Sequence, residues 1–80
     1  MPTLKIEYFA SLREKAGVTQ EIFSGECSTY QDLYEKLSTI HGFVLSPDMI
    51  QVAVNDEFAS MSDPVIDGSK VVFIPPVAGG

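Results

Sequence analysis

A single amphipathic helix is the feature that most constrains the fold of this chain. Thr29 is a typical N-cap residue, Asp32 three positions later forms an approximate capping box, and His41-Gly42 provides a glycine stop. Because 80 residues build only one modest core, this helix must cover whatever sheet the remaining chain forms. The apolar residues that recur at steps of three and four, and so share one helix face, are Tyr30, Leu33, Tyr34, Leu37 and Ile40.

Short apolar or alternating segments on both sides of this helix predict strands. The expected strands cover residues 3–9, 19–23, 50–54, 57–61 and 71–74. Good helix formers at 10–16, followed by Gly17, predict a short additional helix. Asn55-Asp56 is a tight-turn signal between two of the strands. By alternation, the side chains expected to point inward are Leu4, Ile6, Tyr8, Ile50, Val52, Val54 and Ala59.

This order of elements indicates the fold class. One amphipathic helix with four or five strands cannot form a sandwich, and the economical packing lays the helix across one face of a mixed sheet. An early hairpin, a helical crossover and later strands then predict an α+β fold of the β-grasp (ubiquitin-like) type. We expect a β-grasp domain over residues 1–74 and an extended C-terminal tail over residues 75–80.

The predicted tail has an unusual composition. Pro75 and Pro76 cannot donate ladder hydrogen bonds and favour a stiff polyproline II rod. Gly79 and Gly80 carry no Cβ, so the terminal carboxylate can pass through a narrow channel. A frayed end or added residues would be the alternative. The absence of charged residues and serine from this segment, together with the stiff proline pair, favours a functional tail.

Composition excludes several classes of partner. Eleven acidic and five basic residues give a net charge of −6, which argues against nucleic acid and anionic membranes. The acidity favours either solubility alone or attraction to a basic protein surface. Without a long apolar run or a signal-peptide pattern, we expect a cytoplasmic location.

Residue types that often carry chemistry do not form a recognisable site in the sequence. Cys27 is the single cysteine, so neither an intramolecular disulfide nor a cysteine-built metal site is expected, and a packed thiol is favoured over a reactive one. His41 is interpreted as a helix C-terminal residue. The acidic residues lack metal-loop spacing, and no glycine-rich phosphate loop is present. We therefore expect no catalytic site and no bound cofactor or metal.

Three segments resemble the ubiquitin-like sulfur carriers of the MoaD/ThiS-like family, which includes the small subunits of molybdopterin synthase. They are residues 8–17 (YFASLREKAG), Val54-Asn55 with Asp67-Gly68 before Val72-Phe73, and residues 75–80 (PPVAGG). The similarity extends over essentially the whole chain in order and spacing. Thiamin-pathway carriers also end in Gly-Gly, but they usually lack the proline pair, and some archaeal protein modifiers share much of this ending.

The resemblance implies a sulfur carrier for molybdenum cofactor biosynthesis that is not itself an enzyme. A partner enzyme would consume ATP to adenylate the Gly80 carboxylate, and a persulfide donor would supply the sulfur of a thiocarboxylate. The thiocarboxylate would pass sulfur to a pterin precursor in the large synthase subunit, within a heterotetramer. Val77 and Ala78 would complete the tail that delivers it.

A partner-binding surface is also expected. Strand alternation places three large apolar residues, Phe9, Phe58 and Ile74, on the sheet face away from the helix. Their positions match the family's docking patch. Arg13 matches a family arginine near that patch. The alternatives are that each apolar residue packs under a loop and that Arg13 is a solvated helix charge. For the function, the alternatives are a carrier or modifier of another pathway (thiamin, tRNA thiolation or protein conjugation) and a β-grasp interaction module with an inert tail.

Overall fold

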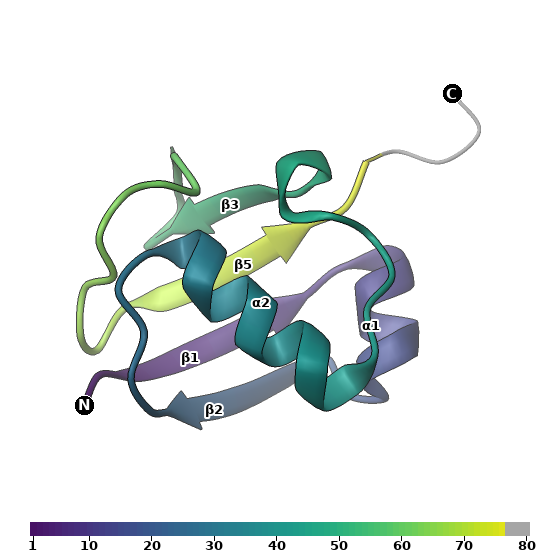
Figure 1. Cartoon of the computed structure of the whole chain (residues 1–80), viewed down its shortest axis with the longest axis horizontal. Helices are drawn as coiled ribbons and strands as arrows, with labels where there is room; N and C mark the ends of the chain where they lie inside the picture. The colour runs from purple at the N-terminus through teal and green to yellow at the C-terminus, as the bar shows by residue number, and fades with distance from the viewer. Residues whose placement is uncertain (77–80) are drawn as a thin grey trace.

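The last strand of the chain lies in the middle of the sheet. A computed structural model describes residues 1–76, and the sequence predictions for Val77, Ala78, Gly79 and Gly80 lie outside these residues. Two helices and a short 3-10 helix accompany the five strands (Figure 1). The elements are β1 Thr3–Tyr8, α1 Ala10–Ala16, β2 Gln20–Ser24, α2 Tyr30–His41, η1 Pro47–Met49, β3 Gln51–Val54, β4 Glu57–Ala59 and β5 Lys70–Ile74.

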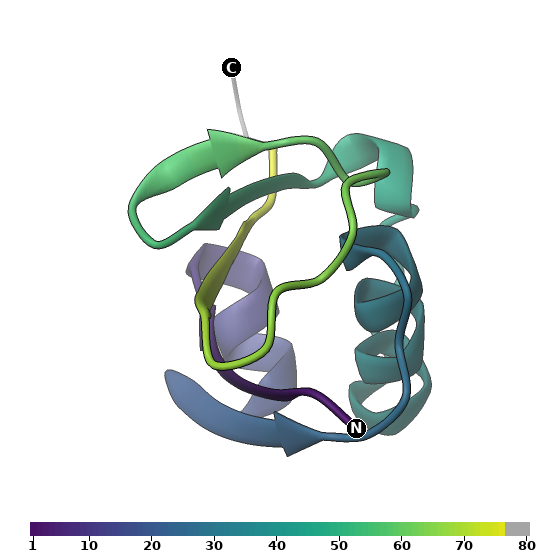
Figure 2. The same ribbon diagram turned by 90° about the vertical axis from the view of Figure 1, so that its left-hand side faces the viewer.

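The strands are ordered β2-β1-β5-β3-β4. β5 pairs in parallel with β1, where Tyr8 lies opposite Phe73, and antiparallel with β3, where Val52 lies opposite the same Phe73. β1–β2 and β3–β4 are antiparallel pairs at the two sides of the sheet. This mixed sheet, with α2 laid across one face, confirms the predicted β-grasp fold (Figures 1 and 2).

The core lies between α2 and the sheet face that it covers. Leu33 and Tyr34 are fully shielded from solvent, as are the strand residues Ile6, Val52 and Phe73. The alternation of inward side chains predicted for β1 and β3 is confirmed, because Leu4, Ile6, Tyr8, Ile50, Val52 and Val54 are all buried. No helix within residues 1–76 is long and apolar enough to cross a lipid bilayer.

The residues at the two ends of α2 explain where this helix begins and where it stops. The Thr29 hydroxyl accepts a hydrogen bond from the Asp32 backbone N–H at 3.1 Å, as expected of an N-cap. The capping box differs from the expected one, because the Asp32 carboxylate accepts from the Ser28 N–H at 2.9 Å and not from Thr29. Gly42 ends the helix with φ +76°, a conformation that costs glycine little.

The sequence prediction for Ile40 is wrong, since its side chain is 63% exposed. The buried positions of α2 are Tyr30, Leu33, Tyr34 and Leu37, and the next inward step falls four residues later, at His41. The His41 side chain is only 14% exposed and packs edge-on against the Tyr8 ring at 5.7 Å. The apolar stripe therefore continues through a histidine that the hydrophobic pattern did not include.

A small polar cluster makes this inward histidine possible. Glu21 on β2 accepts hydrogen bonds on one carboxylate oxygen from the Tyr8 hydroxyl and from His41 Nε2, the latter at 2.6 Å. Burial, with the neighbouring Glu21 carboxylate, raises the pKa of the Tyr8 hydroxyl well above its ordinary value. The cluster joins β1, β2 and the end of α2.

All five strands differ from their expected bounds by one or two residues. β3 begins one residue later than expected, at Gln51, and β5 begins one residue earlier, at Lys70. β1 ends at Tyr8, and Phe9 precedes α1 as its N-cap residue. β2 is shifted one residue later than expected. β4 ends at Ala59 because the chain turns at Ser60, whose N–H donates to the Asp63 carboxylate at 3.0 Å. The predicted turn at Asn55-Asp56 is confirmed, with both residues at positive φ, as the tight hairpin requires.

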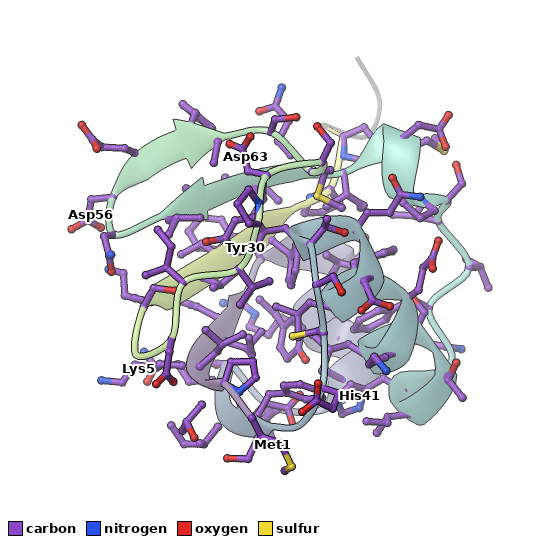
Figure 3. The ribbon with its side chains drawn as sticks, turned by 60° about the vertical axis from the view of Figure 1, so that its left-hand side comes forward. Met1, Lys5, Tyr30, His41, Asp56 and Asp63 are labelled. Atoms are coloured by element: carbon purple, nitrogen blue, oxygen red, sulfur yellow. The ribbon has the colours of Figure 1, made fainter. Side chains whose placement is uncertain are left out.

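The turn after β4 also closes the N-terminal end of α2. The Gln31 N–H donates to the Met61 carbonyl at 2.8 Å, and the Tyr30 N–H donates to the Asp63 carbonyl at 3.3 Å. Two helix N–H groups that have no partner within the helix are thereby satisfied. Figure 3 shows Asp63 near Tyr30 at this end of α2, with His41 at the other end.

Replacing Leu37 by alanine should lower the free energy of unfolding by about 2–5 kcal/mol, because Leu37 is buried in the core and truncation leaves a cavity. Leu33→Ala should cost a similar amount. Ile40→Ala on the same helix is the matched control, and it should change stability by less than about 0.5 kcal/mol. Urea unfolding of the three variants measures these values. Equal losses at Leu37 and Ile40 would contradict the helix orientation.

Tyr8→Phe should make stability less sensitive to alkaline pH. The folded-state pKa of Tyr8 is raised, so its contribution is complete below the ordinary tyrosine pKa of about 10 and declines as pH rises above that value. Removing the hydroxyl should also cost about 0.5–1.5 kcal/mol at neutral pH, through its lost hydrogen bond to Glu21. Thermal melts from neutral to alkaline pH would contradict this account if the wild type and the variant declined in parallel.

Candidate functional site

The residues that lead out of β5 do not leave the protein surface at once. Ile74, the last residue of β5, is partly buried, Pro75 is buried, and Pro76 is exposed. The sequence placed the start of the free tail at Pro75, whereas the structure packs this proline against the domain. Within the described residues, the exposed segment therefore begins one residue later than expected.

Pro75 and Pro76 form one side of a groove whose other side is the start of α1. The groove has a volume of about 550 Å³. Its walls are Phe9, Ala10, Ser11, Arg13, Glu14, Ile74, Pro75 and Pro76. Three of the four residues predicted to bind a partner thus lie together beside both tail prolines.

The position of α1 follows from two residues in its first turn. Leu12 is only 2% exposed and anchors the helix in the core. Ala10 has φ +50°, a left-handed conformation that costs an L-residue free energy, and it turns the chain sharply from β1 into the helix. Because β1 and β5 run in parallel, α1 begins at the sheet end where β5 also ends (Figure 1). We call the groove between them the tail groove.

Phe58, the fourth predicted residue, does not line the tail groove. It is 74% exposed on β4, opposite Ala53 of β3, and Ala53 in turn lies opposite Val72 of β5. Two strand spacings, roughly 10 Å, therefore separate the backbones at Phe58 and Val72. Phe58 and Ile74 share the sheet face away from α2, as their parity predicted, but they are not neighbours on it.

The tail groove is apolar with one charge of each sign. Phe9 is 49% exposed, so this aromatic residue is partly available to a partner. Arg13 and Glu14 line the groove, and Arg13 makes no ion pair within residues 1–76. An arginine next to exposed apolar surface is suited to bind a carboxylate or backbone carbonyls of another chain.

Cys27 and His41, two other residues with potential chemistry, are engaged in packing or hydrogen bonding. Cys27 packs partly against the core, and burial, then the nearby Asp32 carboxylate, raises the pKa of its thiol. The thiol is therefore less reactive than a free cysteine. His41 is engaged by Glu21 in the cluster described above. Among residues 1–76, no group of three His, Cys, Asp or Glu side chains is placed to hold a metal ion.

Two features of the tail groove were missed from the sequence. The burial of Pro75 carries no sequence signal, because it depends on where α1 starts relative to β5. The left-handed conformation of Ala10 is equally hidden, since alanine is an ordinary residue for the first turn of a helix. A signal that points to this place is Phe9, an aromatic residue on the polar side of the β1 pattern.

Comparison with known proteins assigns the chain to a family. A model of the ThiS family matches residues 6–80, which is nearly the whole chain. The chain is 30% identical to a protein named molybdopterin synthase sulfur carrier subunit in Escherichia coli, with 96% of this chain and 99% of that protein covered. It is 35% identical to a protein of the same name in Chlamydomonas reinhardtii, with coverages of 96% and 98%.

Solved structures share the fold. The archaeal protein SAMP1 of Haloferax volcanii aligns with a TM-score of 0.77 and 26% identity, over 98% of this chain and 99% of that one. A Helicobacter pylori complex of subunits 1 and 2 of molybdopterin-converting factor contains a chain of similar fold, with a TM-score of 0.63, 19% identity and coverages of 98% and 99%. The resemblance predicted from the sequence is confirmed, and the chain belongs to the ThiS family.

Proposed function

We propose that this protein is a sulfur carrier for molybdopterin synthesis and that its Gly80 carboxylate is the reacting group. The observation that carries this proposal is the full-length similarity to two proteins named molybdopterin synthase sulfur carrier subunit. The tail groove supports it, because the chain leaves the domain there between apolar residues that suit a docking partner. Gly80 itself lies outside the described residues.

The proposed chemistry requires activation by a second protein, since a carboxylate is a poor electrophile. An adenylating enzyme would join the Gly80 carboxylate to AMP from ATP and release pyrophosphate. The terminal sulfur of a persulfide donor would then displace AMP to give an acyl disulfide. A thiol reductant would cleave its S–S bond, which leaves the thiocarboxylate on Gly80 and a thiol on the donor. The carrier holds no cofactor in this scheme and performs no catalysis, which takes place in its partners.

The partner that receives the sulfur would be the large subunit of a molybdopterin synthase. A subunit 1–subunit 2 complex is known for the Helicobacter pylori protein of similar fold. In this scheme the large subunit binds the tail groove and the outer sheet face, and the tail enters the active site of the large subunit. Pro75 is already buried against the domain, so this residue need not be ordered on binding, which favours affinity.

A protein modifier is the second candidate. The structural similarity to SAMP1, described as a small archaeal modifier protein, favours it at 26% identity. Both functions would start from an activated Gly80, and they differ in the acceptor. A modifier would become attached to amines of other proteins, whereas a carrier would be recovered with a free C-terminus after each cycle.

Deleting Gly80, or Gly79 and Gly80 together, should abolish sulfur transfer to the pterin precursor. The fold should be unaffected, because the core is formed by residues before Pro75. Sulfur transfer assays with the activating enzyme and large subunit measure the first effect, and thermal melts measure the second. A carrier that keeps its activity without Gly80 would contradict the proposal, and a large drop in melting temperature would instead assign the tail a structural role.

Phe9→Asp should weaken binding to the large subunit by more than about 2 kcal/mol, as expected for a central apolar contact. Folding should be preserved, because Phe9 is half exposed and Asp is a favourable N-cap residue for α1. Phe58→Asp should have a similar effect if the partner covers the whole outer face. Isothermal titration calorimetry measures the affinities.

Ile40→Asp is the matched control for these variants, because Ile40 is an exposed apolar residue on the helix side of the sheet. It should bind with wild-type affinity. A loss at Phe9 but not at Phe58 would confine the docking surface to the tail groove. Wild-type affinity for both phenylalanine variants would remove this face from the interaction.

A further inference from the structure

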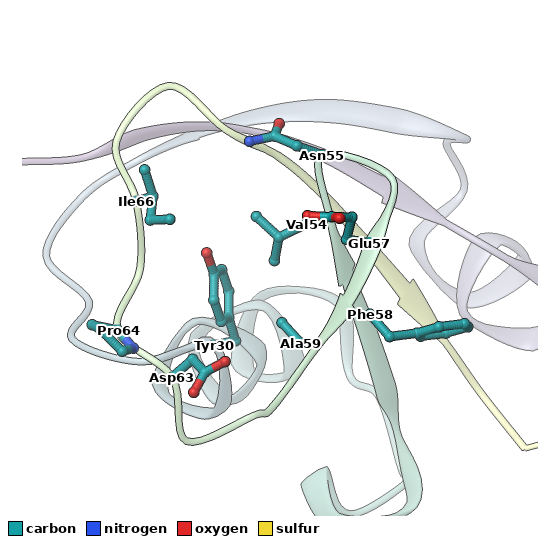
Figure 4. Close-up of a pocket in the computed structure, with 9 residues that line it drawn as sticks. All are labelled: Tyr30, Val54, Asn55, Glu57, Phe58, Ala59, Asp63, Pro64 and Ile66. Atoms are coloured by element: carbon teal, nitrogen blue, oxygen red, sulfur yellow. The ribbon is translucent and has the colours of Figure 1, made fainter.

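A second hollow lies at the end of the molecule opposite the tail groove. It has a volume of about 350 Å³ and is bordered by the β3–β4 hairpin, the start of α2 and the loop after β4. Its walls include the apolar side chains of Val54, Ala59 and Ile66 (Figure 4). It shares no residue with the tail groove, and of its lining residues Phe58 alone belongs to the docking surface predicted for the large subunit.

The Tyr30 hydroxyl is the unusual feature of this pocket. Tyr30 is 1% exposed, and its hydroxyl has no hydrogen-bond partner among the described residues. The two other tyrosine hydroxyls are paired, Tyr8 with Glu21 and Tyr34 with the Leu45 carbonyl at 2.9 Å. Figure 4 shows the Tyr30 hydroxyl pointing into the space between Val54 and Ile66. A buried hydroxyl without a partner costs free energy, which a ligand that bonds to it would recover.

The acidic side chains around the pocket indicate the charge of a ligand that would fit it. Residues 43–69 contain five acidic side chains and neither lysine nor arginine. Two of the acids, Glu57 and Asp63, line the pocket. Asp56 forms an ion pair with Lys70 at 2.9 Å, but neither Glu57 nor Asp63 has an ion pair within residues 1–76. The pocket is therefore suited to a cation.

We propose that this pocket binds the side-chain ammonium group of a lysine presented by a partner protein. The three polar groups, Tyr30, Glu57 and Asp63, come from three different segments. A lysine ammonium is a compact charge with three donors and suits separate acceptors, whereas arginine favours a planar, two-pronged acceptor. The lysine methylene chain would lie against the apolar walls, with the charge toward the carboxylates.

The rim of the pocket favours a polypeptide over a free amine. Phe58 and Ile66 border it and are 74% and 58% exposed. Exposed apolar side chains on both sides of a cation pocket provide surface for the residues that flank a lysine in a protein chain. Covering them would also exclude water from the ion pairs, which strengthens such contacts. A small diamine would leave this apolar surface uncovered.

NMR titration of the full chain tests the proposal. The ligands are an acetylated and amidated Ala-Lys-Ala peptide, the same peptide with norleucine in place of lysine, and free cadaverine. The methyl signals of Val54, Ala59 and Ile66 should shift saturably with the lysine peptide, with a dissociation constant in the millimolar range. The norleucine peptide should produce no saturable shift, and cadaverine should bind more weakly than the lysine peptide.

Tyr30→Phe and Glu57→Gln should each weaken binding of the lysine peptide by about fivefold or more. Glu35→Gln is the matched control, because Glu35 is an exposed acid on α2 that does not line the pocket, and it should bind like the wild type. Equal binding of the norleucine peptide, an equal loss with Glu35→Gln, or no saturable shift would overturn the proposal. Tighter binding of cadaverine than of the lysine peptide would overturn the assignment to a protein partner.

Discussion

The pairing of β5 on both sides is the constraint on which the rest of the structure depends. β5 is held in parallel by β1 and antiparallel by β3, so the C-terminal strand is the centre of the sheet and not an edge. A parallel neighbour requires a crossover, and here the chain between β1 and β5 supplies α2 and the β3–β4 hairpin. The direction in which the chain leaves Ile74 is therefore set by the whole domain.

The same pairing produces the tail groove. Because β1 and β5 run in parallel and their ends coincide, the helix that follows β1 meets the residues that follow β5. α1 is anchored by Leu12 and turned into position by the left-handed Ala10. Pro75 then packs beside α1. A partner that binds the tail groove therefore contacts Ile74 and Pro75 in positions that the domain already fixes.

Much of the fold is predictable because its signals are local. The period of Tyr30, Leu33, Tyr34 and Leu37 identifies α2, and the alternation in β1 and β3 identifies their buried faces. The prediction that Ile40 is buried fails because His41 occupies the inward position beyond Leu37. His41 is stabilised there by Glu21, which lies twenty residues earlier, on β2. A pattern read along one helix contains no information about that pairing.

The candidate site shows the same limit. The alternation of side chains along each strand places Phe58 and Ile74 on the sheet face away from α2. Only the strand order reveals that β3 separates them. Pro75 is buried, and the Tyr30 hydroxyl has no hydrogen-bond partner within residues 1–76. Both features depend on how distant segments pack, so neither has a sequence signal. The role proposed for Gly80 rests on family membership, because this residue lies outside the described residues.

The central claim is that the carboxylate of Gly80 carries the sulfur, and mass spectrometry tests it most directly. The full chain would be incubated with the activating enzyme, ATP and a persulfide donor, followed by measurement of its intact mass and of its C-terminal peptide. The account predicts that one oxygen is replaced by sulfur and that fragmentation locates the sulfur at Gly80. An unchanged C-terminus, or sulfur found on Cys27 instead, would contradict it.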